Sequence, residues 1–471
     1  MKKSNKQINL TELNADYSIY IPSMQPMSAR SVRLKSTDWQ KDSLPYNLEP
    51  KDFDYLRNDN RFWTYKYALA SAENFKDKRN NAVSTKDTHA FILGDSGGFQ
   101  IGKGTFGEAA NWRGMDEKSV SEAWRRSRMR EEIIQWCETN CSYAMTIDIP
   151  LWVKRKNETN SPFNSCSVKR LTELSVENLK YLSDVRGRWS AGEHICKYLN
   201  VLQGDKESDE NNWYKAVKGF KLDGWALAGG VGVVGGPYRI LKRMLIMADE
   251  GLLDKGYDWL HILMLGRLLW SPFVTSIQKA VRKHNPKFTI SYDSSSAYKV
   301  GGQFEHYYWT RELTKDLNTW SHAPLKLPST YGYANSKIPI KLAHTKCIGK
   351  GKCNKCASDG VHLEAPLDSP IAKLLTMQDI LINKDKKAKR RGGKLFDEVL
   401  TNHNVFIIVD SMIRANNAVF LHNNAPEDLM NACGLVGDLF QKNENWDELL
   451  TKNRHLFEKS LDFTPKQDVL G

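Results

Sequence analysis

Short apolar runs that stop abruptly at an acid, an amide or a glycine constrain the fold of this chain more than any other feature. The runs are HAFILGD, YAMTID, YLNVLQG, GWALAGG, LHILMLG and FTISYD, which bring the chain to Asp95, Asp148, Gln203, Gly229–Gly230, Gly266 and Asp293. Between them lie stretches with the spacing of amphipathic helices, among them 119–138, 238–253 and 272–284. Apolar strands that alternate with helices predict a parallel sheet with both faces covered.

Closure of such a sheet into an α/β fold of the (β/α)8 TIM barrel type would place all these run ends on one rim. That rim is the carboxyl-terminal face, where barrels of this type carry their catalytic groups. The alternative is an open, doubly wound sheet whose acids only cap helices. We favour the barrel, because no dinucleotide-type glycine fingerprint follows the first of these runs.

The chain is basic, with a formal net charge of +13 over 471 residues. Such an excess favours polyanionic partners, with nucleic acid ahead of acidic membranes. The first residues, MKKSNKQINLTELN, lack the apolar core of a signal peptide, and no stretch reaches the roughly 18 apolar residues of a membrane span. We therefore expect a cytoplasmic protein with no membrane partner.

Two carboxylates at the run ends, Asp95 and Asp293, form a candidate catalytic pair. One can attack an electrophilic sugar carbon while the other moves protons for the leaving group. Taken singly, each aspartate is equally well explained as a helix cap or a turn former. Their occurrence with the other run ends favours a shared site.

The remaining run ends are suited to binding a planar heterocycle. Asp148 and Gln203 offer acceptor and donor edges, and Gly229–Gly230 allows backbone amides to approach the ring closely. Phe99 follows the two glycines of DSGGFQ and either lies over such a ring or belongs to the core.

Three of the eight cysteines, Cys347, Cys353 and Cys356, crowd into the stretch CIGKGKCNKC. In a reducing compartment this cluster indicates a metal site rather than a disulfide framework, the alternative being three free thiols. Cys353-x2-Cys356 is a common zinc knuckle, and a closed tetrahedral site needs a fourth ligand. His344 and His362 are both near enough in sequence to supply it.

The order of these elements resembles that of the guanine transglycosylases over roughly residues 88–420. The resemblance rests on DSGGFQ at 95–100, the aspartate at 148, QG at 203–204, AGG at 228–230, the aspartate at 293, and a cysteine cluster followed by HNVFIIVDSMIRANNAV at 403–419. Members of that family are (β/α)8 barrels with an inserted zinc site. They exchange a guanine base for a 7-deazaguanine without breaking the nucleic-acid strand.

The resemblance implies a role for each matching residue. Asp293 corresponds to the nucleophile that attacks C1′ and holds a covalent glycosyl intermediate. Asp95 corresponds to the general acid/base that protonates the departing guanine and deprotonates the incoming base. The residues expected to contact the base are Asp148, Gln203, Gly229, Gly230, Phe99 and Ser96.

The resemblance also selects His403, ahead of His344, as the fourth zinc ligand beside the three clustered cysteines. The Zn²⁺ would be structural and would tie the C-terminal helices to the barrel. We assign an N-terminal segment that leads into the barrel, a catalytic barrel, a zinc-binding subdomain with closing helices, and a C-terminal helical tail. Their boundaries are 1–85, 86–340, 341–425 and 426–471.

This chain departs from the tRNA-modifying members of the family in three places. Ile149 and Pro150 stand where those members have an acid and a cysteine, and SSSAYKVGG at 294–302 replaces a cysteine and a proline-threonine-arginine turn. There is no room after residue 425 for the RNA-binding module that archaeal members append. The stretch KDKKAKRRGGK is either a solvated loop or a phosphate contact made by Lys386, Lys387, Lys389, Arg390 and Arg391.

These departures are typical of the DNA-guanine transglycosylases of bacteriophages and bacterial DNA-modification clusters. We therefore predict an enzyme that places a 7-deazaguanine, such as preQ0 or a derivative, into DNA by base flipping or from a single strand. One alternative is a divergent tRNA-guanine transglycosylase. Another is a non-catalytic nucleic-acid-binding subunit, which the presence of both Asp95 and Asp293 disfavours. A homodimer or a partner protein is compatible with the resemblance.

Overall fold

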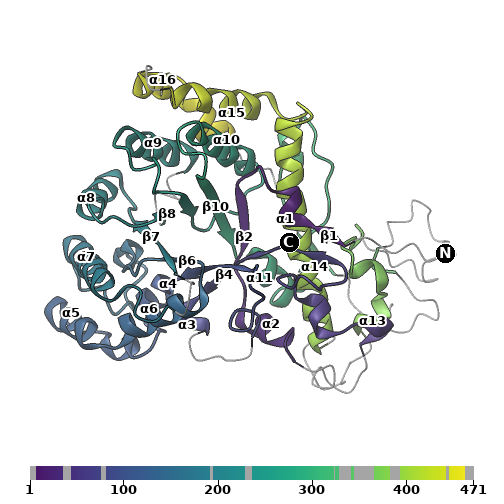
Figure 1. The fold of residues 1–471 in the computed structure, drawn as a ribbon, viewed down its shortest axis with the longest axis horizontal. Coiled ribbons are helices and arrows are strands. Elements are labelled where there is room, and N and C mark those ends of the chain that lie inside the picture. Colours follow the sequence, from purple (N-terminus) through teal and green to yellow (C-terminus); the bar gives the residue numbers. More distant parts are fainter. Residues whose placement is uncertain are drawn as a thin grey trace.

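Eight parallel strands form one sheet whose edges approach each other, so that the sheet is a nearly closed barrel (Figure 1). The computed structural model describes residues 7–34, 44–75, 81–190, 195–228, 236–322, 324–327, 341–343, 365–381, 393–441 and 445–461. The strands are β2 (Ile19–Pro22), β4 (Tyr67–Ser71), β5 (Phe91–Asp95), β6 (Tyr143–Met145), β7 (Lys197–Leu202), β8 (Gly224–Leu227), β9 (Trp259–Ile262) and β10 (Thr289–Ser294).

The strands follow one another around the sheet in chain order, and the last one, β10, pairs with the first, β2. A parallel bridge between Ser23 and Leu69 links the remaining edges of β2 and β4. The predicted parallel α/β sheet is therefore confirmed, and its arrangement is consistent with a (β/α)8 barrel.

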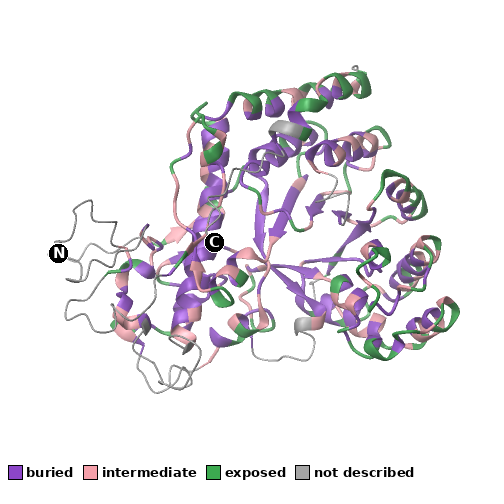
Figure 2. Ribbon diagram, turned by 180° about the vertical axis from the view of Figure 1, so that it is seen from behind, coloured by how far each residue is buried: buried purple, intermediate pink, exposed green. Residues whose placement is uncertain are grey.

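Helices cover the outside of the barrel, with their buried faces toward the strands and their exposed faces outward (Figure 2). Those between strands or directly after β10 are α2 (Pro26–Ser31), α3 (Ala72–Phe75), α4 (Gly98–Lys103), α5 (Glu117–Arg126), α6 (Met129–Asn140), α7 (Val168–Val185), α8 (Glu207–Val217), α9 (Gly236–Asp249), α10 (Trp270–Arg282) and α11 (Ser296–Gly302). The helices predicted at 238–253 and 272–284 are confirmed as α9 and α10. The stretch 119–138 forms two helices, α5 and α6, because Ser127 takes an extended conformation between them.

The remaining elements lie at the two ends of the chain and after the last barrel strand. They are β1 (Ile8–Asn9), α1 (Leu10–Leu13), β3 (Trp63–Thr64), β11 (His306–Tyr307), β12 (Leu325–Lys326), α13 (Met377–Leu381), α14 (Gly393–Phe420), α15 (Glu427–Leu439) and α16 (Trp446–Lys452). Short helical turns occur at Pro45–Asn47, Pro50–Phe53, Ala109–Trp112, Leu151–Lys154, Leu317–Thr319, Ala372–Leu374 and Leu456–Ser460. Within the described residues, no helix is both long and apolar enough to cross a bilayer.

Two of the eight barrel strands, β2 and β4, lie in the segment 1–85 that we had placed ahead of the barrel. The predicted boundary at residue 86 is therefore too late. Neither strand ends in an acid, and the described part of the connection between them contains the short helix α2, two single helical turns and β3 rather than a long amphipathic helix. The strand–helix alternation that identifies the later units is thus missing there.

The long helix α14 takes the place of the helix that closes the barrel after β10. It packs against α10, α11 and β2, and Figure 1 shows it running beside β2 and α1. Asn402 ties it to the N-terminal segment, because its Oδ1 accepts from Trp63 Nε1 at 3.1 Å and its Nδ2 donates to Phe53 O at 3.1 Å.

The barrel interior is filled by aromatic rings at the starts of its strands. Tyr67, Phe91, Tyr143 and Trp259 are the first residues of β4, β5, β6 and β9. Phe91 stacks on Trp259 with ring centroids 4.6 Å apart, Tyr143 lies 5.0 Å from Trp259, and Tyr67 lies 5.4 Å from Phe91. Because side chains alternate along a strand, the residues two and four positions later point inward above this layer.

Replacement of Asn402 by alanine should destabilise the fold. The substitution removes the acceptor of the buried Trp63 N–H, at a cost of roughly 1–3 kcal/mol, and also removes the hydrogen bond to the Phe53 carbonyl, which contributes about 1 kcal/mol. We expect the free energy of unfolding, measured by urea denaturation, to fall by about 2–4 kcal/mol. Asn212→Ala, on the exposed side of α8, should change it by less than about 0.5 kcal/mol. Equal effects of the two substitutions would contradict this account of α14.

Candidate active site

Several residues that the sequence predicts for the site lie within the described part of the chain, and they gather at the carboxyl-terminal rim of the barrel. Asp95 is the last residue of β5, Asp293 lies one residue before the end of β10, and Gln203 follows β7 directly. Asp148 lies three residues after β6. Gly229 and Gly230, which follow β8, lie outside the described residues.

Asp95 is held by the backbone of the turn that follows it. The Gly97 N–H donates to Asp95 Oδ1 at 3.2 Å, and Gly97 has a φ of +82°, in the left-handed region that glycine adopts without strain. Burial raises the pKa of Asp95, and the negative charge of Asp293 raises it further, while the Gly97 N–H opposes both. Asp95 is therefore suited to hold and release a proton.

Asp293 is buried, with 7% of its surface exposed, and is fixed through one oxygen. Its Oδ1 accepts from the Met264 N–H at 2.8 Å and lies 3.4 Å from His261 Nε2. Met264 has a φ of +61°, a conformation that costs a residue with a side chain about 1–2 kcal/mol. This strained backbone aims an N–H at the carboxylate, and strain of this kind clusters at functional sites.

Asp148 and Gln203 form a second buried pair beside Asp95. Gln203 Nε2 donates to Asp148 Oδ2 at 2.6 Å, so the amide orients the carboxylate. Burial raises the pKa of Asp148 to about 7, the Gln203 N–H opposes this, and the charge of Asp95 adds to it. Gly98 lies close to the other carboxylate oxygen, because a Cβ at this position would lie 3.0 Å from Asp148 Oδ1.

Phe99 lies on the surface of the rim, with 57% of its surface exposed, and is not a core residue. Its ring lies 5.4 Å from that of Trp152, and Lys103 Nζ lies 5.8 Å from the Phe99 ring and 5.1 Å from the Trp152 ring. Trp152 belongs to the helical turn Leu151–Lys154, which follows Ile149 and Pro150. The exposed Phe99 ring is thus the aromatic surface at this part of the rim, since Trp152 is partly buried and Lys103 Nζ also donates to Glu158 Oε2 at 2.6 Å.

Ser96 directly follows Asp95 in the DSGGFQ motif. Its side chain is buried, and its Oγ has no hydrogen-bond partner among the described residues. A hydroxyl in this state beside Asp95 can bond to a ligand.

His403 is the one predicted zinc ligand among the described residues, since Cys347, Cys353 and Cys356 lie outside them. It is fully buried on α14, with Nε2 2.8 Å from Tyr308 O and Nδ1 3.4 Å from the Ser369 N–H. Because a carbonyl oxygen only accepts, Nε2 carries the hydrogen and Nδ1 the lone pair.

The described residues include one of the four predicted zinc ligands, His403. Burial lowers the pKa of His403 to about 4, so the ring is neutral at physiological pH. Zinc-binding histidines are commonly oriented by such a hydrogen bond from the second ring nitrogen, but the Nδ1 lone pair of His403 accepts from the Ser369 N–H, so a metal ion at Nδ1 would have to replace that bond. Within the described part of the chain, no three acidic, histidine or cysteine side chains are grouped as metal ligands. The basic residues Lys386, Lys387, Lys389, Arg390 and Arg391 also lie outside that part.

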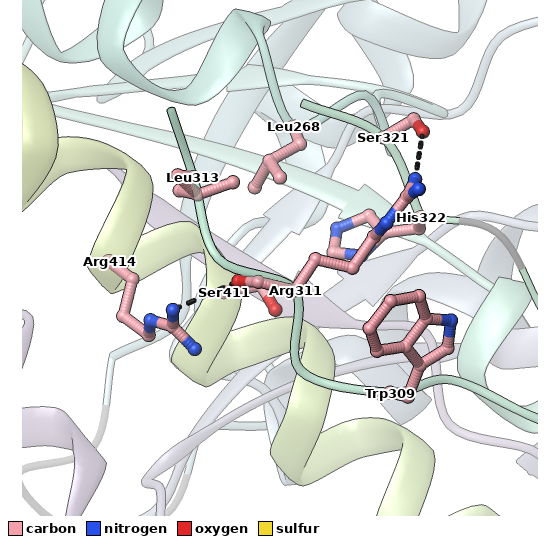
Figure 3. Close-up of a pocket in the computed structure, with 8 residues that line it drawn as sticks. All are labelled: Leu268, Trp309, Arg311, Leu313, Ser321, His322, Ser411 and Arg414. Atoms are coloured by element: carbon pink, nitrogen blue, oxygen red, sulfur yellow. Dashed lines mark hydrogen bonds between the residues drawn. The ribbon is translucent and has the colours of Figure 1, made fainter. Parts of the chain in front are cut away.

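Two further cavities are lined by none of the rim carboxylates. The cavity in Figure 3 is lined by Trp309, Arg311, His322 and Arg414, among others. Its volume of about 10 Å³ is enough for about one water molecule. A larger cavity of about 290 Å³ lies between the ends of α9 and α10 and residues of α15 and α16. Because helices of such a barrel end at the amino-terminal side of its strands, this cavity faces away from the carboxyl-terminal rim.

Sequence reasoning missed four residues of the site, namely His261, Met264, Trp152 and Ser71. Ser71 is the neighbour of Asp95 in the register of β4 and β5, and its side chain lowers the pKa of Asp95. A histidine inside the apolar run LHILMLG was a usable signal for His261. No sequence pattern indicates the positive φ of Met264.

Comparison with known proteins adds no assignment: no protein-family model matches the chain, and a search of curated proteins finds no relative.

The raised pKa of Asp148 predicts a pH dependence of stability. An unfolded aspartate has a pKa near 3.9, so between about pH 4 and pH 7 the folded state keeps a proton that the unfolded state has lost. This contribution therefore stabilises the fold at low pH and is lost as the pH rises. An asparagine side chain does not titrate, so the stability of Asp148→Asn relative to wild type should rise by roughly 4 kcal/mol between pH 4 and pH 8.

The measurement is urea denaturation of both proteins over this pH range. Asp184→Asn, on the exposed face of α7, is the matched control and should show no comparable trend. A stability difference between wild type and Asp148→Asn that stays constant with pH would contradict the buried, protonated state of Asp148.

Proposed function

We propose that this protein is a DNA-guanine transglycosylase, a glycosyltransferase that exchanges guanine for a 7-deazaguanine through a covalent aspartyl-glycosyl intermediate. The observation that carries the proposal is the pair of rim carboxylates in different surroundings. Asp95 is a half-buried acid with a raised pKa, whereas Asp293 is fixed by the backbone N–H of Met264 at 2.8 Å. A proton donor and an oriented nucleophile are the two groups that base exchange requires.

The exchange takes place in two balanced steps. The Asp293 carboxylate attacks C1′ of the target nucleotide, the bond from C1′ to the base nitrogen breaks, and the departing guanine takes a proton from the Asp95 carboxylic acid. The incoming 7-deazaguanine then gives its ring N–H proton to the Asp95 carboxylate, and its nitrogen attacks C1′. The ester bond to Asp293 breaks, and both carboxyl groups return to their starting states.

The buried pair Asp148 and Gln203 is suited to the edge of a guanine-like base. Adjacent N–H donors of such a base fit Oδ1 of Asp148, the oxygen that Gln203 does not contact, and the amide of Gln203 retains an N–H and an oxygen for further contacts. Phe99 and Trp152 supply aromatic faces for stacking. Ser96, Gly229 and Gly230 are assigned to the same pocket from the sequence resemblance.

DNA is the polymer we propose, with tRNA as the alternative. The residues that replace the acid and cysteine of the tRNA enzymes, Ile149 and Pro150, lead into the helical turn that carries Trp152 beside Phe99. The exposed Phe99 ring beside the partly buried Trp152 favours unstacked bases, as in a flipped nucleotide or a single strand. The net charge of +13 suits a polyanionic partner. We place the reaction in the cytoplasm, that of the host if the enzyme is phage-encoded.

A structural zinc ion bound by Cys347, Cys353, Cys356 and His403 is part of the proposal. Bound there, it would supply folding stability rather than chemistry at the base. The Nε2–H bond to the Tyr308 carbonyl would orient His403, and α14 would carry that constraint to the barrel.

Elemental analysis should therefore find one zinc ion per chain, and His403→Ala should lose it. His403→Cys should keep part of the zinc, because a thiolate also binds this metal. Thermal unfolding of the metal-free protein should begin at a lower temperature than that of the zinc-loaded protein. His344→Ala and His362→Ala are the controls, and loss of zinc in either of them with retention in His403→Ala would show that the ligand is misassigned.

Substitutions of the two rim acids test the reaction. Asp293→Asn should abolish both base exchange and the covalent protein–nucleic acid adduct seen on denaturing gels, with folding intact. Asp95→Asn should slow exchange by about 10²- to 10⁴-fold, because proton transfer to the departing base is lost. Asp258→Asn, at the opposite end of the barrel from the rim, is the control and should keep full activity. Full activity of Asp293→Asn would end the transglycosylase proposal.

The same assay identifies the polymer. Labelled guanine is incubated with the enzyme and duplex DNA, single-stranded DNA or tRNA, and the label retained in each polymer is counted. We expect incorporation into DNA. Incorporation into tRNA alone would support the alternative function, and binding without incorporation into any polymer would support a non-catalytic subunit.

A further inference from the structure

We propose that His261 is a positioning residue that presents its Nε2–H to Asp293 and leaves the second carboxylate oxygen free to attack. This inference rests on the proposed function, in which Asp293 is the nucleophile. His261 lies on β9 and is fully buried, directly opposite Ser291 in the register of β9 and β10. Since side chains alternate along strands, Trp259 and His261 on β9 face the same interior as Ser291 and Asp293 on β10.

A chain of contacts connects these four side chains from the aromatic layer to the rim. Trp259 Nε1 donates to Ser291 Oγ at 2.7 Å, Ser291 Oγ lies 2.9 Å from His261 Nδ1, and His261 Nε2 lies 3.4 Å from Asp293 Oδ1. The direction of the hydrogen bonds follows from a count of hydrogens. An indole nitrogen only donates, so Ser291 Oγ accepts there and keeps its own hydrogen for another partner.

The hydroxyl hydrogen of Ser291 has one available acceptor among the described residues, which is His261 Nδ1. Nδ1 then carries the lone pair and Nε2 carries the hydrogen. Protonation of the ring would also leave a hydrogen on Nε2. The Trp259–Ser291 pair therefore selects the ring state in which a donor, and not a lone pair, faces the carboxylate.

This donor acts on the same oxygen that the backbone holds. Asp293 Oδ1 receives the Met264 N–H at 2.8 Å and faces His261 Nε2 at 3.4 Å. Oδ2 has no hydrogen-bond partner among the described residues and keeps its lone pairs for C1′. The 3.4 Å separation is long for a hydrogen bond, and catalytic hydrogen bonds are often long before the substrate is bound.

Three substitutions separate a positioning role from a merely structural one. The shorter amide of His261→Asn would lie near the former Nδ1 and keep the contact with Ser291, but would not reach Asp293. The longer amide of His261→Gln would extend an N–H to the position of the former Nε2. We expect His261→Asn to slow single-turnover formation of the covalent adduct by about 10- to 100-fold, as for loss of a hydrogen bond to a charged group. His261→Gln should recover most of that rate, and His261→Phe should resemble His261→Asn.

Binding and stability are measured on the same proteins. The dissociation constant of the free 7-deazaguanine base, from calorimetry, should change little in His261→Asn and His261→Gln, because His261 contacts the nucleophile rather than the base pocket. Wild-type adduct rates in His261→Asn would overturn the proposal. So would rate losses that follow losses of thermal stability across the series, with no recovery in His261→Gln.

A spectroscopic measurement tests the geometry without any activity. In protein labelled with ¹⁵N-histidine, the imidazole nitrogen shifts of His261, assigned by comparison with His261→Asn, should report hydrogen on Nε2 and a lone pair on Nδ1. Ser291→Ala should shift the Nδ1 resonance. A hydrogen on Nδ1 with a bare Nε2 would overturn the proposal. The Nε2–H form in a protein that forms no adduct with DNA or tRNA would refute the transglycosylase function while retaining the His261–Asp293 contact.

Discussion

A closed barrel of eight strands must fill its own interior, and the aromatic residues at the strand starts meet that requirement here. Phe91, Tyr143 and Trp259 pack ring against ring at one end, so the alternating positions above them can carry smaller and polar side chains. The polar positions are also stabilised by this layer, since the Trp259 N–H bonds to Ser291. The aromatic layer at the strand starts therefore helps to position the polar side chains toward the carboxyl-terminal rim.

The rim acids are withdrawn from water to different degrees, and different hydrogen-bond donors contact them. Charged groups withdrawn from water prefer to be neutral unless donors compensate them, so the number of donors at each carboxylate matters. Asp95 has one long bond from a turn N–H and keeps a raised pKa, while Asp148 has the shorter Gln203 bond and a pKa raised to about 7. Asp293 is contacted by a backbone N–H at 2.8 Å. The donors that orient the three acids therefore differ: a turn N–H at Asp95, a side-chain amide at Asp148 and the backbone N–H of Met264 at Asp293.

Most of the barrel, but less of its site, could be predicted from sequence. Strands that end in Asp95 or Asp293 have a strong pattern, because an apolar run and a terminal acid coincide. β2 and β4 lack that pattern, and their barrel positions depend on long-range pairing that no local signal encodes. The exposure of Phe99 and the positive φ of Met264 depend on how loops pack, and the contact of His261 with Asp293 depends on strand register. These features depend on tertiary packing, which no local sequence pattern encodes.

In the proposed exchange, the charge of Asp148 links base binding to proton release. With a pKa raised to about 7 by burial, the empty pocket is about half protonated at neutral pH. A heterocycle that presents N–H donors to Asp148 Oδ1 stabilises the carboxylate and displaces that proton, whereas a base that presents an acceptor favours the neutral acid. Guanine and 7-deazaguanine share the donor edge and differ at the ring atom in position 7. The pocket can therefore accept both partners of the exchange while it discriminates against bases that lack adjacent donors.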